Sequence, residues 1–314
     1  MSNKNLHKSK IEKNDEFYTQ FADINKEIKY YKNFLQNKII YCNCDNYKES
    51  NFWKYFYQNF DNLKLKKLIA TYYNIKEPAH KIEYDGKNKM ITTLKGNGDF
   101  RSQECIDILK SSDIVVTNPP FSLFREFVDY LIDYKKQFLI IRNKNAINYN
   151  NVLNCICKNE LRFGYTIPEK FITPKGITKK LRGLCRWFTN LKIEKSYQKL
   201  NLTKRYNPID YSTYDNYNAI NVNKVSDIPY DYNGIMGVPI TYIDKHNPEQ
   251  FKILGRSGNI SWAINDCTFF TPPSKEKQYI YKSYDKNWRV QNSYLLNEEG
   301  LPISIYYRLF IRKI

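Results

Sequence analysis

The stretch Asp113-Ile114-Val115-Val116-Thr117-Asn118-Pro119-Pro120-Phe121 decides the fold of this chain. Its β-branched run at residues 114–116 is typical of a buried strand, and the two prolines end that strand abruptly. In open α/β sheets, ligands bind just beyond the carboxyl ends of such strands. The chain therefore places an amide, two rigid prolines and an aromatic ring where a binding site is expected.

The chemistry of this turn suits an amino group attached to a flat ring. The side-chain oxygen of Asn118 and the backbone carbonyl of Pro119 can both accept hydrogen bonds from such an amine. Phe121 can stack on a base that has been flipped out of a duplex. We therefore predict that Asn118, Pro119, Pro120 and Phe121 are catalytic, the alternative being a tight strand-to-helix turn without a chemical role.

The charge of the chain points to a polyanionic partner. Its 314 residues include 50 Lys+Arg against 32 Asp+Glu, which gives a formal net charge of +18 and favours nucleic acid. The chain is also rich in Lys, Asn, Ile and Tyr together, as an AT-biased genome would encode, so composition accounts for part of this charge.

The cysteines and histidines indicate neither a disulfide framework nor a metal site. Seven cysteines are scattered along the chain, and none of the three histidines lies near the Cys-x-Cys pairs at 42/44 and 155/157. No apolar run reaches transmembrane length, and the N-terminus is polar. We expect a soluble, cytoplasmic protein with no metal and no membrane partner.

Hydrophobic spacing predicts alternating helices and strands in the first two thirds of the chain. Phe17, Phe21, Ile24 and Ile28 recur at helical spacing, which predicts a helix that starts near Asn14. Strands are predicted at 38–42, 68–70, 90–94, 113–117 and 138–141. Further helices are predicted at 104–110 and 151–157, and two more are expected to begin at N-caps formed by Ser50 and Ser122.

This alternation predicts an α/β fold with a mostly parallel sheet and right-handed crossovers. Residues 161–167 and 184–189 are expected to form the final, partly antiparallel pair of the sheet. Residues 1–13 are polar and basic and are expected to be disordered. The pattern changes near residue 195, so we predict one domain at 14–195 and a mixed or β-rich region at 196–314.

The order of several motifs resembles one enzyme family. Phe17-Tyr18-Thr19 comes first, Cys42-Asn43-Cys44-Asp45 follows a strand, and Gly98-Asp99-Phe100 precedes the turn at residues 118–121. Over roughly residues 14–255, this order resembles the EcoRI-type adenine-specific DNA methyltransferases, which use S-adenosylmethionine. The resemblance implies a Rossmann-like class I methyltransferase sheet with helices on both faces, and a smaller C-terminal target-recognition region at 196–314.

The resemblance also implies a cofactor site. Tyr18 and Thr19 match the motif that helps to hold the methionine end of S-adenosylmethionine, and Asp99 with Phe100 matches the motif that contacts its adenine. The cofactor loop corresponds to Cys42, Asn43, Cys44 and Asp45. The usual glycine-rich loop is missing there, and Asp45 could equally cap the next helix, as Asp99 could simply form a turn. No carboxylate follows the strand at 68–70, so the contact to the ribose hydroxyls is unassigned.

Basic and amide side chains are predicted to contact DNA near the same edge of the sheet. Arg142 and Asn145 follow the strand at 138–141, and they would line the target pocket or satisfy backbone groups. A basic segment follows later in the chain, and its side chains would contact DNA phosphates; the alternative is a solvated loop. These residues are Lys175, Lys179, Lys180, Arg182 and Arg186.

The predicted reaction is transfer of a methyl group from S-adenosylmethionine to the exocyclic amino nitrogen of a flipped adenine. Direct in-line transfer needs alignment more than a strong base. The resemblance suggests protection of DNA from restriction, with a possible cognate endonuclease that acts on the same site without a stable complex. The alternatives are an RNA or protein-glutamine methyltransferase of the same fold, and a catalytically silent DNA-binding decoy.

Overall fold

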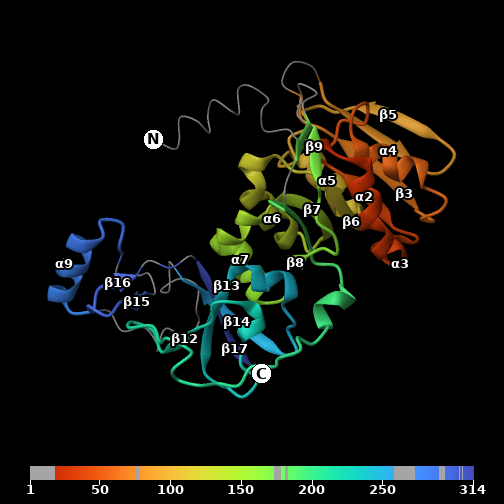
Figure 1. Cartoon of the computed structure of the whole chain (residues 1–314). Coiled ribbons are helices and arrows are strands. Elements are labelled where there is room, and N and C mark those ends of the chain that lie inside the picture. The colour runs from red at the N-terminus through yellow and green to blue at the C-terminus, as the bar shows by residue number, and fades with distance from the viewer. Residues whose placement is uncertain are drawn as a thin grey trace. The chain divides into compact units, whose positions relative to one another are not determined.

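The computed structural model describes residues 18–74, 78–172, 178–180, 183–257, 273–289, 294–303, 305 and 307–314 (Figure 1). The chain divides into two compact units. The first comprises the described residues up to Val152 together with Leu161–Lys192, and the second comprises Leu153–Glu160 and Ile193–Ile314. The segment predicted to be disordered, residues 1–13, lies outside the described residues.

The centre of the first unit is a sheet of eight strands in the order β5-β4-β3-β2-β6-β7-β11-β8. Its middle four strands run parallel to one another: β3 (Lys67–Thr71), β2 (Ile39–Cys42), β6 (Ile114–Thr117) and β7 (Gln137–Asn143). The β-branched run of β6 is fully buried, as expected for a strand covered on both faces. The predicted strand that decides the fold is therefore confirmed.

The prediction of a mostly parallel sheet was wrong, because only three of the seven strand pairs are parallel. A strand that the sequence analysis missed, β4 (His80–Tyr84), pairs antiparallel with β3 and forms a hairpin with β5 (Lys89–Thr93). The predicted strand at 90–94 thus exists, but it lies exposed at the edge of a hairpin instead of continuing the parallel order.

The opposite edge of the sheet agrees with the prediction of a final antiparallel pair. The strand β11 (Cys185–Thr189) pairs antiparallel with both β7 and β8 (Arg162–Phe163). Trp187 and Phe188 of β11 are fully buried. This strand therefore closes the hydrophobic core at that side.

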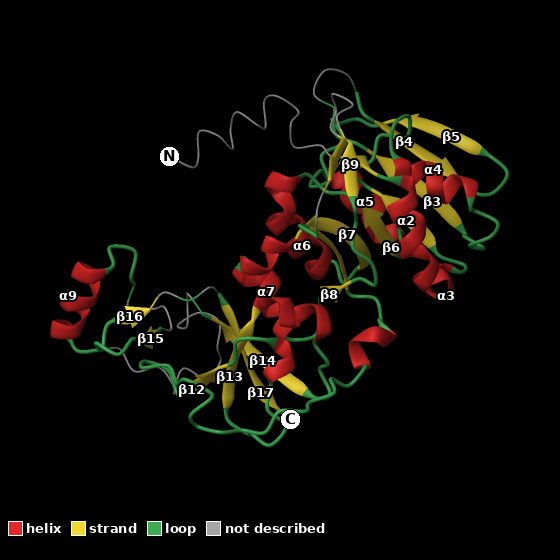
Figure 2. Cartoon of the chain, viewed as in Figure 1, coloured by secondary structure: helices red, strands yellow, loops and turns green. Residues whose placement is uncertain are grey.

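Helices pack against this sheet, as Figure 2 shows. Ser50 caps α4 by accepting from the amides of Phe52 and Trp53, as predicted. Ser122 does not cap α6; it lies in the 3-10 helix η2 (Phe121–Leu123), and α6 begins at Phe124. The helices of this unit are α2 (Phe21–Ile28), α3 (Lys32–Leu35), α4 (Asn51–Gln58), α5 (Gln103–Ser111) and α6 (Phe124–Asp133), whereas most of α7 (Asn150–Cys157) belongs to the second unit.

The helix α2 begins at Phe21, later than predicted; the predicted start near Asn14 itself lies outside the described residues. The residues before it form β1 (Tyr18–Thr19), which pairs with β9 (Lys170–Ile172), and β9 pairs with β10 (Thr178–Lys180). Asp23 of α2 accepts hydrogen bonds from the backbone amides of Glu169 and Lys170, which holds β9 beside the start of the helix. Long-range pairing therefore overrides the helical spacing before Phe21.

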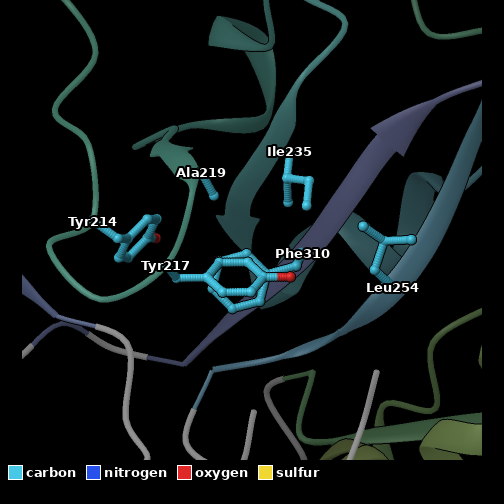
Figure 3. Packing of buried hydrophobic residues seen from close by; sticks show 6 residues of the cluster. All are labelled: Tyr214, Tyr217, Ala219, Ile235, Leu254 and Phe310. Carbon is cyan, nitrogen blue, oxygen red and sulfur yellow. The ribbon is translucent and has the colours of Figure 1, made fainter. Parts of the chain in front are cut away.

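The second unit has its own sheet, in the order β12-β13-β17-β14. Figure 3 shows its core cluster, in which the Tyr217 ring lies 4.4 Å from that of Phe310, centroid to centroid. The strands are β12 (Ala219–Asn221), β13 (Ile235–Pro239), β14 (Phe251–Arg256) and β17 (Arg308–Lys313).

A smaller part of this unit combines α9 (Lys275–Tyr284) with the hairpin of β15 (Leu295–Leu296) and β16 (Pro302–Ile303). Its core consists of Tyr281, Trp288 and Tyr294. The unit is thus mixed in structure, and target recognition by residues 196–314 stays a prediction.

Candidate active site

The predicted cofactor loop, residues 42–45, and the predicted catalytic turn, residues 118–121, emerge from neighbouring strands. In the register of β2 and β6, Ile40 pairs with Ile114 and Tyr41 with Val115. Because these strands are parallel, the residues that follow each of them leave the sheet at the same edge. The structure thereby brings together two motifs that lie about 70 residues apart in the sequence.

Asp45 connects these two motifs directly. Its Oδ1 accepts a hydrogen bond from Ser50 Oγ at 2.6 Å, and its Oδ2 accepts one from Thr117 Oγ1 at 2.5 Å. The backbone N–H of Asn118 also donates to this carboxylate. In addition, the Cys44 amide donates to Thr117 Oγ1 at 3.3 Å. The cofactor loop is therefore bonded to the last residue of β6 and to the first residue of the catalytic turn.

Burial controls the ionisation of this region. Asp45 is 7% exposed, and the loss of hydration raises its pKa to about 6, although the hydrogen bonds from Ser50, Thr117 and Asn118 partly oppose the shift. Burial also raises the pKa of the Cys42 and Cys44 thiols well above their usual value. Near neutral pH the loop thus contains one buried carboxylate and two neutral thiols.

The catalytic turn itself is only partly covered. Pro119 is buried, whereas Asn118, Pro120 and Phe121 are of intermediate exposure. The Phe121 ring meets the Phe171 ring of β9 edge to face, at 6.2 Å between centroids. Phe121 therefore remains partly accessible, whereas the side-chain oxygen of Asn118 is buried.

The Arg142 guanidinium lies over the same aromatic ring. Its carbon is 4.4 Å from the centroid of Phe121 and 5.4 Å from that of Phe124. Within the described part of the chain, its Nε and Nη1 atoms are buried without a hydrogen-bond partner. Such donors are costly unless a ligand satisfies them, so Arg142 fits the predicted target pocket.

Two buried polar atoms fit a cofactor site. Thr19 is 3% and Asn43 is 1% exposed, and Thr19 Oγ1 and Asn43 Nδ2 have no hydrogen-bond partner among the described residues. Asn51 of α4 donates to the Thr19 carbonyl at 2.8 Å, which ties β1 to the helix that follows the loop. For Tyr18 the structure describes only the backbone, in β1.

Asp99 and Phe100 precede α5 in a segment that passes beside the end of the strand β3. A side chain at Gly98 would collide with the Tyr72 carbonyl, so the glycine allows the two segments to touch. Both oxygens of Asp99 accept from the Arg101 guanidinium, which lowers the pKa of Asp99. The Phe100 ring is buried against Phe127 and Tyr130, 5.1 and 5.3 Å between centroids.

The predicted DNA contacts are only partly described. Arg186 is 7% exposed and donates to the carbonyls of Gly183 and Cys185. Asn145 lies exposed in η3 (Lys144–Asn148), and Lys180 lies exposed on β10. Lys179 is described by its backbone alone, in β10, and Lys175 and Arg182 lie outside the described residues.

Sequence analysis missed Thr117 and Phe171 as parts of this site. Thr117 is the last residue of a predicted strand, and a hydroxyl at the end of an otherwise apolar run is a signal for a polar role. Phe171 carries no comparable signal, because only the pairing of β9 with β1 brings it to the turn.

Comparison with known proteins decides the family. The family described as adenine-specific methyltransferase EcoRI matches residues 5–313. The chain belongs to this family. Membership makes it an adenine-specific DNA methyltransferase, as the motif order predicted, and neither alternative substrate class is favoured.

Curated relatives agree with this membership. The type II methyltransferase M.EcoRI of Escherichia coli is 46% identical over 292 residues, which cover 81% of this chain and 89% of the relative. M.MgeORF184P of Mycoplasma genitalium is 41% identical, covering 79% of this chain and 85% of its own length. M.MpnI of Mycoplasma pneumoniae is 39% identical, with 79% and 84% covered. A comparison with solved structures found no match.

The described residues contain neither a candidate membrane span nor a candidate metal-binding cluster. No helix there has the length and hydropathy that crossing a membrane requires. Nor do three or more His, Cys, Asp or Glu side chains gather there in a way that could hold a metal ion.

Proposed function

We propose that this methyltransferase transfers a methyl group from S-adenosylmethionine to the exocyclic amino nitrogen of an adenine flipped out of duplex DNA. The observation that carries the proposal is the carboxylate of Asp45, which bonds the cofactor loop to the catalytic turn at the carboxyl edge of the sheet. A methyl donor held by one motif would then face an amine held by the other.

The residues around this edge fit the cofactor. Bound S-adenosylmethionine would supply hydrogen-bond partners for the buried Thr19 Oγ1 and Asn43 Nδ2 atoms. Tyr18, Cys42 and Cys44 of the same two segments would also contact it. Asp99 and Phe100 lie beside the end of β3, where the adenosine of S-adenosylmethionine would bind. When bound, S-adenosylmethionine supplies a methyl group that its sulfonium has already activated.

The turn would orient the amine. Asn118 Oδ1 and the Pro119 carbonyl oxygen would accept hydrogen bonds from the two N–H groups of the amine, so that the nitrogen lone pair points out of the base plane. Phe121 and Pro120 would pack on the base, and stacking offsets part of the cost of flipping. No base of high pKa is needed, because the amine loses its proton only after the methyl group is attached.

DNA would approach the same edge of the sheet. We propose that basic side chains and one amide side chain contact the DNA phosphates and line the pocket for the flipped base. Residues 196–314 would read the other bases. The proposed contacts are Arg142, Asn145, Lys175, Lys179, Lys180, Arg182 and Arg186. The enzyme would act in the cytoplasm and protect DNA from a cognate endonuclease that recognises the same sequence.

Expression in a strain that lacks adenine methylation tests this function. We expect the wild-type enzyme to modify adenines within one short sequence, mapped by long-read sequencing, and Asn118→Ala to abolish the modification. Asn88→Ala, an exposed asparagine in the turn between β4 and β5, is the control and should leave it unchanged. Soluble wild-type protein that binds the cofactor but leaves every adenine unmodified would overturn the proposal.

A further inference from the structure

We propose that Asp45 is a positioning residue that sets the catalytic turn relative to the cofactor loop, and that it does not bind the cofactor. This inference rests on the proposed function, because it assigns a role in that reaction. The sequence left two interpretations of Asp45 open, a cofactor ligand and a helix cap. The proposed positioning role replaces both.

The first argument is that the carboxylate is already occupied. Ser50 Oγ and Thr117 Oγ1 each bond one of its oxygens, and the Asn118 amide is a third donor. The side chain is 7% exposed. A carboxylate that binds ribose hydroxyls needs free lone pairs facing the ligand, and Asp45 directs its own toward the protein.

The second argument is that Asp45 lies at the centre of a hydrogen-bond network that joins four segments. Ser50, which donates to Asp45, also caps α4 by accepting from Phe52 N and Trp53 N. The next residue, Asn51, donates to the carbonyl of Thr19 in β1. Thr117 accepts from the Cys44 amide while donating to Asp45. The end of β2, the start of α4, β1 and the catalytic turn therefore share one network.

The third argument concerns charge. The groups that face Asp45 are the thiols of Cys42 and Cys44 from its own segment, the Ser50 hydroxyl from α4, and Thr117 with the Asn118 amide from β6 and the turn. In the described part of the chain, no lysine or arginine forms an ion pair with it. An ionised Asp45 can accept from all three donors, whereas a protonated one must donate and gives up an acceptor position.

The consequence is a coupling between Asp45 and the geometry of Asn118. Protonation or amidation of Asp45 would loosen the turn without removing any group that contacts the base or the cofactor. Because a displacement near 1 Å in an active site can cost about 100-fold in rate, the effect should appear in the methyl-transfer step.

The experiment compares Asp45→Asn with Glu27→Gln. Glu27 is a matched control, since it is also a fully buried carboxylate with a raised pKa, but it ties α2 to the loop after β8. We would measure cofactor affinity by calorimetry and the single-turnover methylation rate at saturating cofactor, with plasmid DNA from a strain without adenine methylation. Asp45→Asn should slow transfer about 10- to 100-fold and change the cofactor Kd less than about threefold.

A second pair of variants guards against misfolding of Asp45→Asn. Thr117→Val removes the bridging hydroxyl and should reproduce the slow transfer, while Thr117→Ser keeps the hydroxyl and should restore most of the rate. The wild-type single-turnover rate should fall below about pH 6, and Asp45→Asn should lack this ionisation while Glu27→Gln retains it.

Hydrogen exchange gives a readout that does not depend on activity. Amides of the catalytic turn should exchange faster in Asp45→Asn than in the wild type and in Glu27→Gln. The inference fails if Asp45→Asn weakens cofactor binding more than about tenfold while the saturated rate is unchanged, because that pattern identifies a ligand. It also fails if neither the rate nor the exchange changes. Wild-type enzyme without methylation activity would instead contradict the proposed function.

Discussion

The guanidinium of Arg142 lies 4.4 Å from the centre of the Phe121 ring, so the end of β7 and the catalytic turn share one cation–π contact. The contact joins a residue proposed to stack on the target base with a cation whose Nε and Nη1 atoms are buried and unpaired in the described part of the chain. A phosphate or a base edge would satisfy these donors when DNA binds.

Replacing Arg142 tests this interpretation. We expect Arg142→Ala to weaken DNA binding about tenfold and to reduce the slope of log affinity against log salt by about one. Titrations of labelled duplex at several salt concentrations measure both. Arg125→Ala is the control, because Arg125 also lies over an aromatic ring, that of Tyr149, but outside the proposed site. An unchanged salt slope with a lower Tm would mean that Arg142 only packs.

The hydroxyl of Thr19 offers a second test. It is buried without a hydrogen-bond partner among the described residues, which costs stability unless a ligand bonds it. We expect Thr19→Val to weaken S-adenosylmethionine binding by about 1 kcal/mol, or roughly fivefold, and to keep or raise the Tm of the free protein. Calorimetry and thermal melts measure the two quantities. Unchanged cofactor affinity would remove Thr19 from the site.

The parts of this picture that the sequence could predict depend on local signals. The run at 114–116 and the Ser50 cap act through neighbouring residues, so both were predicted and confirmed. The strand β4 was missed because its sequence, His-Lys-Ile-Glu-Tyr, has a single buried residue, Ile82, and so shows no apolar pattern, although both of its pairing partners, β3 and β5, are its neighbours in the chain. The predicted start of α2 was wrong for a non-local reason, because Tyr18–Thr19 form a strand that pairs with β9, far along the chain.

The candidate site was predictable as a set of motifs but not as a network. The bond between Asp45 and Thr117 spans 72 residues, and no local pattern announces it. The alternation of strands did predict that both motifs reach the same edge of the sheet. What it could not supply was which side chains face each other there, because that depends on burial and on the register of β2 and β6.

Asp45 should also affect folding stability. Its contribution should fall as pH rises, whereas the contribution of a salt-bridged aspartate rises with pH. The pKa of Asp45 is raised from 3.8 to about 6, so the folded protein binds a proton more tightly than the unfolded chain. Folding stability therefore falls as pH rises from about 4 to about 6 and levels off above that. At 1.36 kcal/mol per pKa unit, the full cost is about 3 kcal/mol.

Replacing this carboxylate should recover part of that cost. We expect Asp45→Asn to be about 1–2 kcal/mol more stable than the wild type at about pH 8, and the difference to shrink toward about pH 4. Urea unfolding of both proteins across this range measures it. Greater stability with slower methylation would show that the enzyme retains a buried charge for function. A variant that is less stable at about pH 8 would contradict the raised pKa.

Gly98 provides the last test, of the close approach that sets Asp99 beside β3. Its φ of +75° and the collision that any side chain at this position would make with the Tyr72 carbonyl both oppose any other residue. We expect Gly98→Ala to lower the free energy of unfolding by about 3 kcal/mol or more and to weaken cofactor binding. Gly183→Ala separates the two causes, because its φ is +74° but, among the described residues, a side chain there would meet Arg186 Nη1 alone, at 3.8 Å. That variant should lose about 1–2 kcal/mol, the conformational part alone. Equal losses in urea unfolding would mean that the approach of Gly98 to Tyr72 contributes nothing.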